Sequence, residues 1–455
     1  MNNNLLPINK VICGDAIGSL KIFPDNHFDS IVTDPPAGIS FMGKMWDDDK
    51  GGRDKWIKWL SEVFIEAKRV LKPGSHALVW ALPRTSHWTA MALEDAGFEI
   101  RDCIYHVFGS GFPKSMDISK QIDKQAGVER KVIGKMEPFG REKRRSPMGG
   151  FGASDIDYGG GFIDDNLKTI TEPCTESAKQ WSGWGTSLKP AVECWWLVRK
   201  PPSENTITEN VLKWGVGGLN IDECRISVSA DDRHNYGING DEGEPTVNCY
   251  GKNNRVAYEQ HTKGRFPANL IHDGSNEVLA GFPQTQSSKG MYVRKTGDKQ
   301  FFECMGDGKR NNPDGLCDNG SASRFFYCAK PSRVERNDGL DRIIKKKMDE
   351  GRKEGNPGGD NPRNRGVVER ANHHPTVKAQ ALMEYLIKLI TPPNSIGLDM
   401  FAGSGSTLIA YKKLGHQYIG IEIDPEYCKI AELRLIANMN GNRSLDTFNM
   451  PIEQY

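Results

Sequence analysis

The chain has 455 residues, enough for two or three domains and a sizeable core. Its 60 basic and 59 acidic side chains nearly cancel, which excludes a uniformly basic nucleic-acid coat but not local basic faces. The sequence contains no run of about 18 apolar residues, so no membrane span is expected. The first residues lack the basic and apolar regions of a signal peptide. The ten cysteines include no Cys-x-x-Cys pair, so we expect a cytoplasmic protein with reduced thiols and without a disulfide framework or a metal site.

The first predicted strand, Val11 to Cys13, turns at Gly14-Asp15 into a short helix. Asp15 therefore lies where a strand gives way to a helix, and ligands bind at that end of the strands in open α/β sheets. A plain helix cap is at least as good an interpretation of Asp15 from this segment alone.

The next predicted strand ends in Ile31-Val32-Thr33 and continues into Asp34-Pro35-Pro36-Ala37. Two prolines fix φ and carry no N–H, so the chain leaves the sheet stiffly. The Asp34 carboxylate and the Pro35 carbonyl then form a site with acceptors and no donor, which suits an exocyclic amine with two N–H bonds to give. A turn without chemistry is the alternative, because motifs this short also occur by chance.

Strands and helices alternate after this turn. Their β–α–β–α–β order predicts a doubly wound, mostly parallel sheet of the Rossmann-like α/β class. The predicted elements are a helix over 55–71, strands over 76–81 and 98–107 with a helix over 86–97 between them, and a strand over 191–200.

Two long segments lack this periodicity. Residues 121–165 combine glycines with a basic cluster, and we interpret them as a surface loop. Residues 203–371 hold few apolar runs, and we interpret them as an irregular module inserted into an α/β domain made of 1–202 and 372–455. A basic, loop-rich insert fits phosphate contact, although a solvated linker is the competing interpretation of the charge run at 342–370. The candidates for DNA contact are Lys44, Arg144, Arg145, Lys345, Lys346 and Lys347.

The last periodic segment predicts a cofactor site. A strand beginning at Leu398 feeds a Gly403-x-Gly405 turn that opens a helix, and Glu422 lies near the end of the next strand. The glycines let the backbone approach a ligand, and the acidic residue can accept both ribose hydroxyls. The dinucleotide spacing has Leu408 in place of a third glycine, and there is no P-loop lysine. A nucleoside without phosphates therefore fits better, and S-adenosylmethionine is the common one.

Three motifs together resemble those of DNA amino-methyltransferases. Their order, with the catalytic motif first and the cofactor motif last, is similar to the β subgroup of N6-adenine/N4-cytosine DNA methyltransferases. The resemblance covers roughly 1–202 and 372–455 and implies that 203–371 is the target-recognition region. The motifs are Thr33-Asp34-Pro35-Pro36, His374-Pro375-Thr376-Val377-Lys378 and Asp399-Met400-Phe401-Ala402-Gly403-Ser404-Gly405-Ser406-Thr407.

The resemblance implies site-specific transfer of a methyl group from S-adenosylmethionine to N6 of a flipped adenine in double-stranded DNA, by an enzyme of bacterial or phage type. Asp34 and the Pro35 carbonyl would accept the hydrogens of the amine while its lone pair attacks the methyl group. Asp399 would face the methionine amino group and Glu422 the ribose. The resemblance weakens the cap interpretation of Asp15, because it implies contact with the adenine ring. The implied cofactor residues are Asp15, Ala16, Thr376, Lys378, Asp399, Phe401, Ala402, Gly403, Ser404, Gly405, Thr407, Glu422 and Ile423.

Ala37 departs from the family pattern, which usually has an aromatic residue that stacks on the flipped base. Flipping needs such a surface, because unstacking a base costs a few kcal/mol. Another aromatic residue (Phe41, Trp46 or Phe108) supplies the stack, or the chain belongs to a subfamily with a small residue there, or the alanine is an engineered substitution that weakens activity. We favour the first two.

Other functions remain as alternatives. N4-cytosine methylation uses the same site, although Ser in place of Asp34 is commoner there, and a DNA-binding homologue without catalysis would fit Ala37. A 5-methylcytosine enzyme would need a nucleophilic cysteine, but Pro173-Cys174 lies in a loop-like segment and in the wrong order. A nicotinamide-dependent oxidoreductase is the least favoured. The recognition sequence and the oligomeric state, a homodimer included, stay open, and a cognate restriction nuclease would be a separate chain.

Overall fold

The chain folds into two units, one built from residues 1–109, 192–350 and 369–455 and the other from 110–191 and 351–368. The structure is a computed structural model. It describes residues 6–40, 45–111, 115–135, 169–227, 247–248, 251–252, 263–286, 319–330, 335, 337–340, 371–374 and 376–438.

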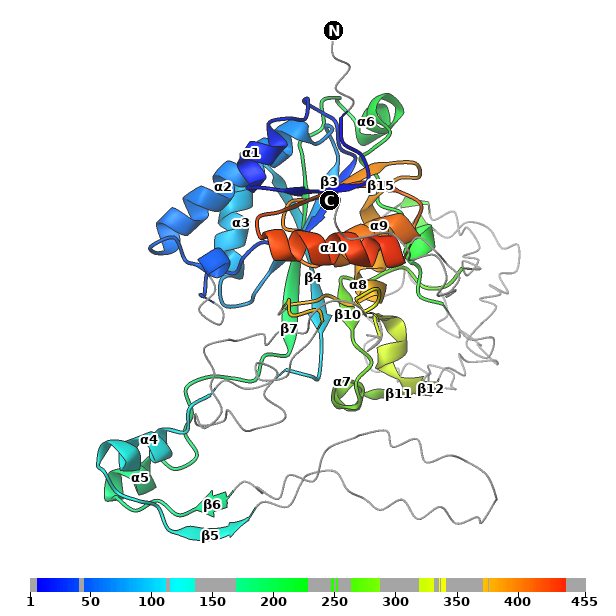
Figure 1. Ribbon diagram of the computed structural model, residues 1–455. Helices are drawn as coiled ribbons and strands as arrows, with labels where there is room; N and C mark the ends of the chain where they lie inside the picture. Colours follow the sequence, from blue (N-terminus) through cyan, green and yellow to red (C-terminus); the bar gives the residue numbers. More distant parts are fainter. Residues whose placement is uncertain are drawn as a thin grey trace, which may run out of the picture. The chain divides into compact units, whose positions relative to one another are not determined.

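The first unit is organised around one nine-stranded sheet (Figure 1). Its strands are β1 (Lys10–Cys13), β2 (Ser30–Thr33), β3 (His76–Ala81), β4 (Glu99–Val107), β7 (Val192–Arg199), β10 (Leu270–His272), β13 (Tyr327–Cys328), β14 (Ile396–Asp399) and β15 (Gln417–Glu422). They lie in the order β1-β15-β14-β2-β3-β7-β4-β10-β13. All neighbours are parallel except β7, which runs antiparallel to both β3 and β4. The predicted doubly wound, mostly parallel sheet is confirmed.

Helices cover both faces of the sheet. Successive side chains of a strand point to opposite faces, so Ile31 and Val32 of β2 belong to two different apolar clusters. The cluster of Ile31 includes Phe64 and other side chains of α2, and the cluster of Val32 includes Leu386 of α8. The helices are α1 (Ala16–Leu20), α2 (Arg53–Val70) and α3 (Ser86–Asp95) on the first face, and α8 (Gln380–Ile390), α9 (Ser406–Lys413) and α10 (Pro425–Ala437) on the second.

The direction of winding reverses between β14 and β2. From β14 the chain passes through α9 to β15 on one side, and from β2 it passes through α2 to β3 on the other. Since α9 and α2 cover opposite faces, β14 and β2 form the topological switch point of the sheet. Ligands of open α/β sheets bind in the crevice at the carboxyl ends of such a pair.

Part of the segment 203–371, which the sequence marked as an inserted module, extends the sheet. β10 pairs in parallel with β4, and β13 pairs in parallel with β10. These strands have three and two residues, too few for an alternating pattern to be visible in the sequence. Smaller elements complete the described part of this segment: α6 (Ile207–Trp214), η3 (Asp222–Cys224), β8 (Val247–Asn248), β9 (Gly251–Lys252), α7 (Asn276–Gly281), β11 (Gln284–Gln286), β12 (Asn319–Ser321) and η5 (Ala322–Phe325).

The second unit contains α4 (Ile118–Gln125), β5 (Val132–Lys135), β6 (Thr169–Thr171) and α5 (Glu176–Gln180). β5 and β6 pair as an antiparallel ribbon. The buried Asp123 carboxylate accepts hydrogen bonds from the backbone N–H groups of Cys174 (3.1 Å) and Thr175 (3.0 Å), which ties α4 to the start of α5. The interpretation of 121–165 as loop is therefore wrong at its beginning, where α4 and β5 lie.

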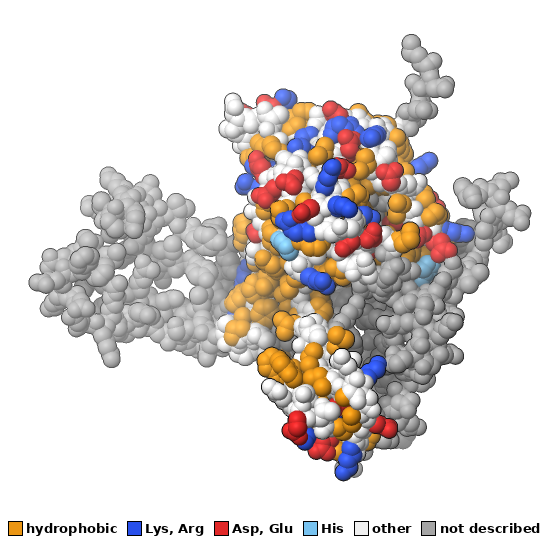
Figure 2. All heavy atoms as spheres, turned by 90° about the vertical axis from the view of Figure 1, so that its left-hand side faces the viewer, with side chains coloured by type: hydrophobic (Ala, Val, Ile, Leu, Met, Phe, Trp, Pro, Cys, Tyr) orange, Lys and Arg blue, Asp and Glu red, His pale blue; other side chains and the backbone are white. Residues whose placement is uncertain are grey.

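No helix in the described ranges is long and apolar enough to cross a membrane. On the face shown in Figure 2, basic and acidic side chains are interspersed over the described surface. This mixture agrees with the net charge of +1.

Candidate active site

Two acidic side chains lie at the switch point. Asp399 is the last residue of β14, and Asp34 directly follows β2. The Thr33 hydroxyl donates to Asp399 Oδ1 at 2.7 Å, and the Phe401 N–H donates to the same oxygen at 3.0 Å. Because β14 and β2 are parallel neighbours, both acidic residues lie at the carboxyl edge of the sheet.

The turn after Asp34 is fixed by contacts at its far end. The Thr85 hydroxyl donates to the Ala37 carbonyl at 2.9 Å, and the Gly38 N–H donates to the buried Asp47 carboxylate at 2.9 Å. Among the residues that the structure describes, no group donates to the Pro35 carbonyl. The turn thus carries the two predicted acceptors, but the prediction that no donor lies there is wrong, because Lys378 Nζ is 3.2 Å from Asp34 Oδ2.

The second half of the site is formed by Glu422, the last residue of β15. Its two carboxylate oxygens accept the N–H groups of Gly403 (2.7 Å) and Asp424 (2.9 Å). β1 ends beside it, since Cys13 pairs with Glu422. Asp15, two residues further, is exposed and caps α1 by accepting the Gly18 N–H at 2.8 Å. The capping role of Asp15 is thus present in the structure, and its contact with an adenine ring stays a prediction.

The glycine turn between β14 and α9 needs its glycines. Gly403 and Gly405 have φ values of +50° and +79°, a region that favours glycine. A Cβ at Gly403 would lie 2.8 Å from Nε2 of the His374 ring, so a larger residue would collide with the wall of the turn. Gly403 thus lies between the His374 ring and the Glu422 carboxylate, which accepts its N–H.

Burial sets the electrostatics of this edge. It raises the pKa of Asp399 to about 6, and it also raises the pKa of Glu422. Burial likewise raises the pKa of Asp34 to about 6, where Glu193 and Asp399 add to the effect and Lys378 opposes it. Three carboxyl groups in one water-poor region therefore hold protons more tightly than exposed ones, and a cationic or N–H-donating ligand would relieve their repulsion.

Lys378 joins Asp34 to a fourth carboxylate, that of Glu193. Its Nζ lies 3.2 Å from Asp34 Oδ2, 3.7 Å from Glu193 Oε2 and 4.0 Å from the centre of the Trp80 ring. Glu193 also lies 3.8 Å from Nδ1 of His106 on the adjacent strand β4. Although burial acts to raise it, Lys378 and His106 hold the pKa of Glu193 at about 2. The role in cofactor binding that the resemblance implies for Lys378 stays a prediction.

The aromatic candidates for base stacking lie in different places. The Trp46 ring stacks on His374, with centroids 6.3 Å apart and planes 14° apart, and so lies near the glycine turn. The Phe108 ring lies 5.9 Å from His106, on the side of Glu193 and Lys378. The third candidate, Phe41, is outside the described residues. Also outside them are the DNA-contact candidates Lys44, Arg144, Arg145, Lys345, Lys346 and Lys347.

The remaining predicted cofactor residues surround the same turn. Thr407 and Ser404 are buried, Ala402 donates its N–H to the Ile421 carbonyl at 2.9 Å, and Phe401 lies 6.1 Å from the Trp59 ring. Other positions lie further out: Ala16 opens α1, the Thr376 N–H donates to Nδ1 of His374 at 3.4 Å, and Ile423 is exposed.

Sequence reasoning missed two charged residues that organise the site. Glu193 is the only acidic residue of strand β7, which is otherwise apolar up to Arg199 at its end, and this isolation was its signal. Arg434 of α10 is buried and donates to the hydroxyls of Ser404 (3.0 Å) and Ser406 (3.3 Å), which braces the glycine turn. Its spacing of four and three residues from the buried Ile430 and Ala431, on one face of the helix, was the corresponding signal.

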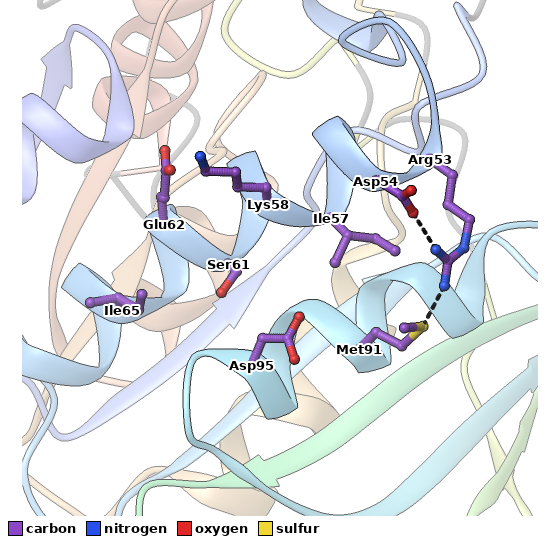
Figure 3. A pocket seen from close by; sticks show the side chains of 9 residues that line it. All are labelled: Arg53, Asp54, Ile57, Lys58, Ser61, Glu62, Ile65, Met91 and Asp95. Atoms are coloured by element: carbon purple, nitrogen blue, oxygen red, sulfur yellow. Dashed lines mark hydrogen bonds and ion pairs between the residues drawn. The ribbon is translucent and has the colours of Figure 1, made fainter.

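A shallow depression between α2 and α3 lies away from these residues (Figure 3). Its polar lining is mixed in charge: Arg53 pairs with Asp54 and donates to the Met91 sulfur at 3.1 Å, and Lys58 and Glu62 lie on the same helix. These charges are already paired or of opposite sign, so we assign no ligand to it.

The fold and the site define a class of protein. A doubly wound α/β domain with acidic residues and a glycine turn at its switch point is typical of nucleoside-binding proteins. A family model described as DNA methylase matches residues 28–124 and 319–433, which include β2, the Asp34 turn, the glycine turn and Glu422. These two segments of the chain are thus similar to the N6/N4 DNA methylases.

Similar proteins match over short segments. Type II methyltransferase M2.DpnII of Streptococcus pneumoniae is 43% identical over 76 residues, which are 17% of this chain and 28% of that protein. DNA adenine methyltransferase YhdJ of Escherichia coli (strain K12) is 41% identical over 76 residues, 17% of this chain and 26% of that protein. The chain therefore spans less than a third of these curated relatives. Among solved structures, PvuII DNA methyltransferase (cytosine-N4-specific) is 13% identical, with 95% of this chain and 87% of that chain covered and a TM-score of 0.40.

Proposed function

We propose that this protein transfers a methyl group from S-adenosylmethionine to the exocyclic N6 amine of adenine in double-stranded DNA. The observation that carries the proposal is the acceptor site at the switch point. Asp34 and the open Pro35 carbonyl lie on a rigid turn at the carboxyl edge, and Thr33 links this turn directly to Asp399. An amine donor and a nucleoside cofactor would thus bind at adjacent strand ends.

The residues present fit S-adenosylmethionine. The Glu422 carboxylate is held by two backbone N–H groups and still has lone pairs for ribose hydroxyls. Asp399 is a buried carboxylate suited to an ammonium group, and Gly403 lies between the Glu422 carboxylate and the His374 ring. When bound, this cofactor supplies an electrophilic methyl group.

The chain's own groups act on the target amine. Hydrogen bonds to Asp34 and to the Pro35 carbonyl draw the nitrogen lone pair away from the base ring and orient it for attack. The methylated nitrogen must then lose a proton. Asp34, with a pKa of about 6, is mostly ionised at neutral pH and can accept that proton. No covalent link to the protein is needed.

The target base must leave the duplex to reach Asp34, and Ala37 offers it no ring. Ala37 lies at the margin of the apolar cluster beneath α8, with its carbonyl already bound by Thr85. We propose Phe108 as the stacking residue, because it lies beside His106 on the Asp34 side of the site. Trp46 would then line the cofactor side with His374.

We propose adenine as the target base because of Asp34 and because the similar protein YhdJ is a DNA adenine methyltransferase. We further propose that 203–371 recognises the DNA sequence, that the protein acts in the cytoplasm of a bacterium or an infected cell, and that a cognate restriction nuclease would be a separate chain.

The test is a nucleoside digest of DNA treated with the protein and S-adenosylmethionine, separated by mass spectrometry. N6-methyladenine is the expected product. N4-methylcytosine would overturn the choice of base but keep the mechanism. If the cofactor binds and no methylated base appears, the proposal of catalysis fails, and Ala37→Tyr would show whether the missing ring is the reason.

A further inference from the structure

One buried ammonium group is shared by two carboxylates. Lys378 Nζ lies 3.2 Å from Asp34 and 3.7 Å from Glu193, and its side chain is 11% exposed. The Trp80 ring, with its centre 4.0 Å away, covers the ammonium on another side. Lys378 is therefore shared between the two carboxylates and lies nearer to Asp34.

The sheet register explains why these groups meet. Trp80 of β3 lies opposite Trp195 of β7, and His106 of β4 lies opposite Glu193 of β7. Because side chains alternate along a strand, Glu193 and Trp195 point to the same face, which α8 covers. Lys378 lies two residues before α8, and its ammonium group lies near Glu193 and the Trp80 ring. The arrangement depends on β7 being antiparallel to β3 and β4. Only then does the N-terminal end of β7, which carries Glu193, lie at the carboxyl edge of the parallel strands.

We propose that Glu193 is a positioning residue for Asp34, which holds the Lys378 ammonium partly away so that an Asp34 oxygen stays available to the target amine. This inference rests on the function proposed above. A hydrogen bond from an ammonium to a carboxylate is stronger than one from an uncharged amine to the same carboxylate. If Asp34 were its only counter-ion, Lys378 would form a close ion pair with Asp34 and would exclude the target base from it. Glu193 competes for the same protons and prevents this.

Several charged groups face the pair, and their effects on Asp34 have opposite signs. Glu193 and Asp399 repel the Asp34 anion, and Lys378 attracts it. His106 faces Glu193 from β4. Replacing Glu193 by Gln removes a like charge and lets Lys378 approach Asp34, and both changes lower the pKa of Asp34. Replacing Lys378 by Met removes the attraction and raises that pKa.

The first readout is the pH profile of methyl transfer by the full-length protein. In Glu193→Gln, the acidic limb of kcat/KM should move about one unit to lower pH, while the plateau rate falls roughly tenfold because Lys378 now competes with the amine. In Lys378→Met the limb should move to higher pH. Glu193→Asp, which keeps the charge, should restore the wild-type limb. Glu62→Gln removes an exposed carboxylate from α2 and should match the wild type.

The second readout does not need catalysis. Infrared titration of the ligand-free protein follows the protonated-carboxyl band that Asp34→Asn abolishes, so its midpoint reports Asp34 alone. The midpoint should fall in Glu193→Gln and rise in Lys378→Met. An unchanged midpoint in a folded Glu193→Gln protein would overturn the inference even if DNA is methylated. Shifted midpoints without any methylated base would keep the coupling of Glu193 to Asp34 and overturn the proposed function instead.

Discussion

Replacing Asp34 by Asn should stabilise the protein above pH 6 while it abolishes methyl transfer. The side chain is 19% exposed, and burial raises its pKa to about 6, so its ionised form is disfavoured in the folded state. Asn resembles the protonated carboxyl in size and carries no charge. Lys378 would keep Glu193 as its counter-ion.

The magnitude follows from the pKa of Asp34. One unit of pKa difference between folded and unfolded states corresponds to about 1.4 kcal/mol, so ionising Asp34 in the folded protein costs about 3 kcal/mol. Between about pH 4 and pH 6 the folded state binds a proton that the unfolded chain has released, and stability therefore falls as the pH rises. Asp34→Asn does not undergo this loss. Its advantage should be absent below about pH 4 and complete above about pH 6.

The assay is thermal unfolding of both proteins at pH 4.5, 6 and 8. At pH 8 the variant should unfold several degrees above the wild type, which corresponds to about 3 kcal/mol for a domain of this size. Asp399 is present in both proteins, and its repulsion of the Asp34 anion is part of the raised pKa from which the difference is worked. Glu62→Gln serves as the control for loss of an exposed carboxylate. A variant that is equally or less stable at pH 8 would refute the argument that Asp34 sits in a water-poor acceptor site.

Three further predictions concern the cofactor, the base and the DNA. Gly403→Ala should weaken binding of S-adenosylmethionine at least tenfold, as measured by calorimetric titration. The control is Gly415→Ala, where φ is +78° and nothing lies within 4 Å of the new Cβ. This variant should lose similar stability but no affinity for the cofactor. Phe108→Ala should lower turnover on DNA roughly tenfold at unchanged cofactor affinity, and Phe108→Tyr should not; equal rates for all three proteins would exclude the stacking role. Neutralising the basic clusters together should flatten the salt dependence of DNA binding. If the slope of affinity against salt concentration does not change, the interpretation of these segments as solvated loops is correct. These clusters are Arg144, Arg145, Lys345, Lys346 and Lys347.

Local sequence predicted the strand-end residues well because their chemistry is local. The strand before Asp34 and the strand before Gly403 end in the structure at Thr33 and Asp399, next to the predicted motifs. Prolines and glycines mark such ends through φ alone, which requires no knowledge of the rest of the fold.

The partners of those residues were not predictable in the same way. Glu193 reaches Asp34 only because β7 is antiparallel and inserted between β3 and β4, and no local pattern distinguishes a parallel from an antiparallel buried strand. The cap formed by Asp15 is local and was one of the two interpretations of the sequence, whereas the exposure of Ile423 depends on how β1 and β15 end side by side. Prediction therefore succeeded for single motifs and failed for contacts between distant strands.

The switch point also explains why the order of the motifs does not matter to the chemistry. The Thr33 hydroxyl and the Asp399 carboxylate are separated by 366 positions in the chain and by 2.7 Å in space. Parallel pairing of β14 with β2 requires only that both strands end at the same edge, whichever is made first. The long segment between them can then vary in length and content, because β10 and β13 attach it to the far side of the sheet, beyond β7 and β4. The Asp34 turn near the start and the glycine turn near the end of the chain thus come to lie side by side through strand pairing alone.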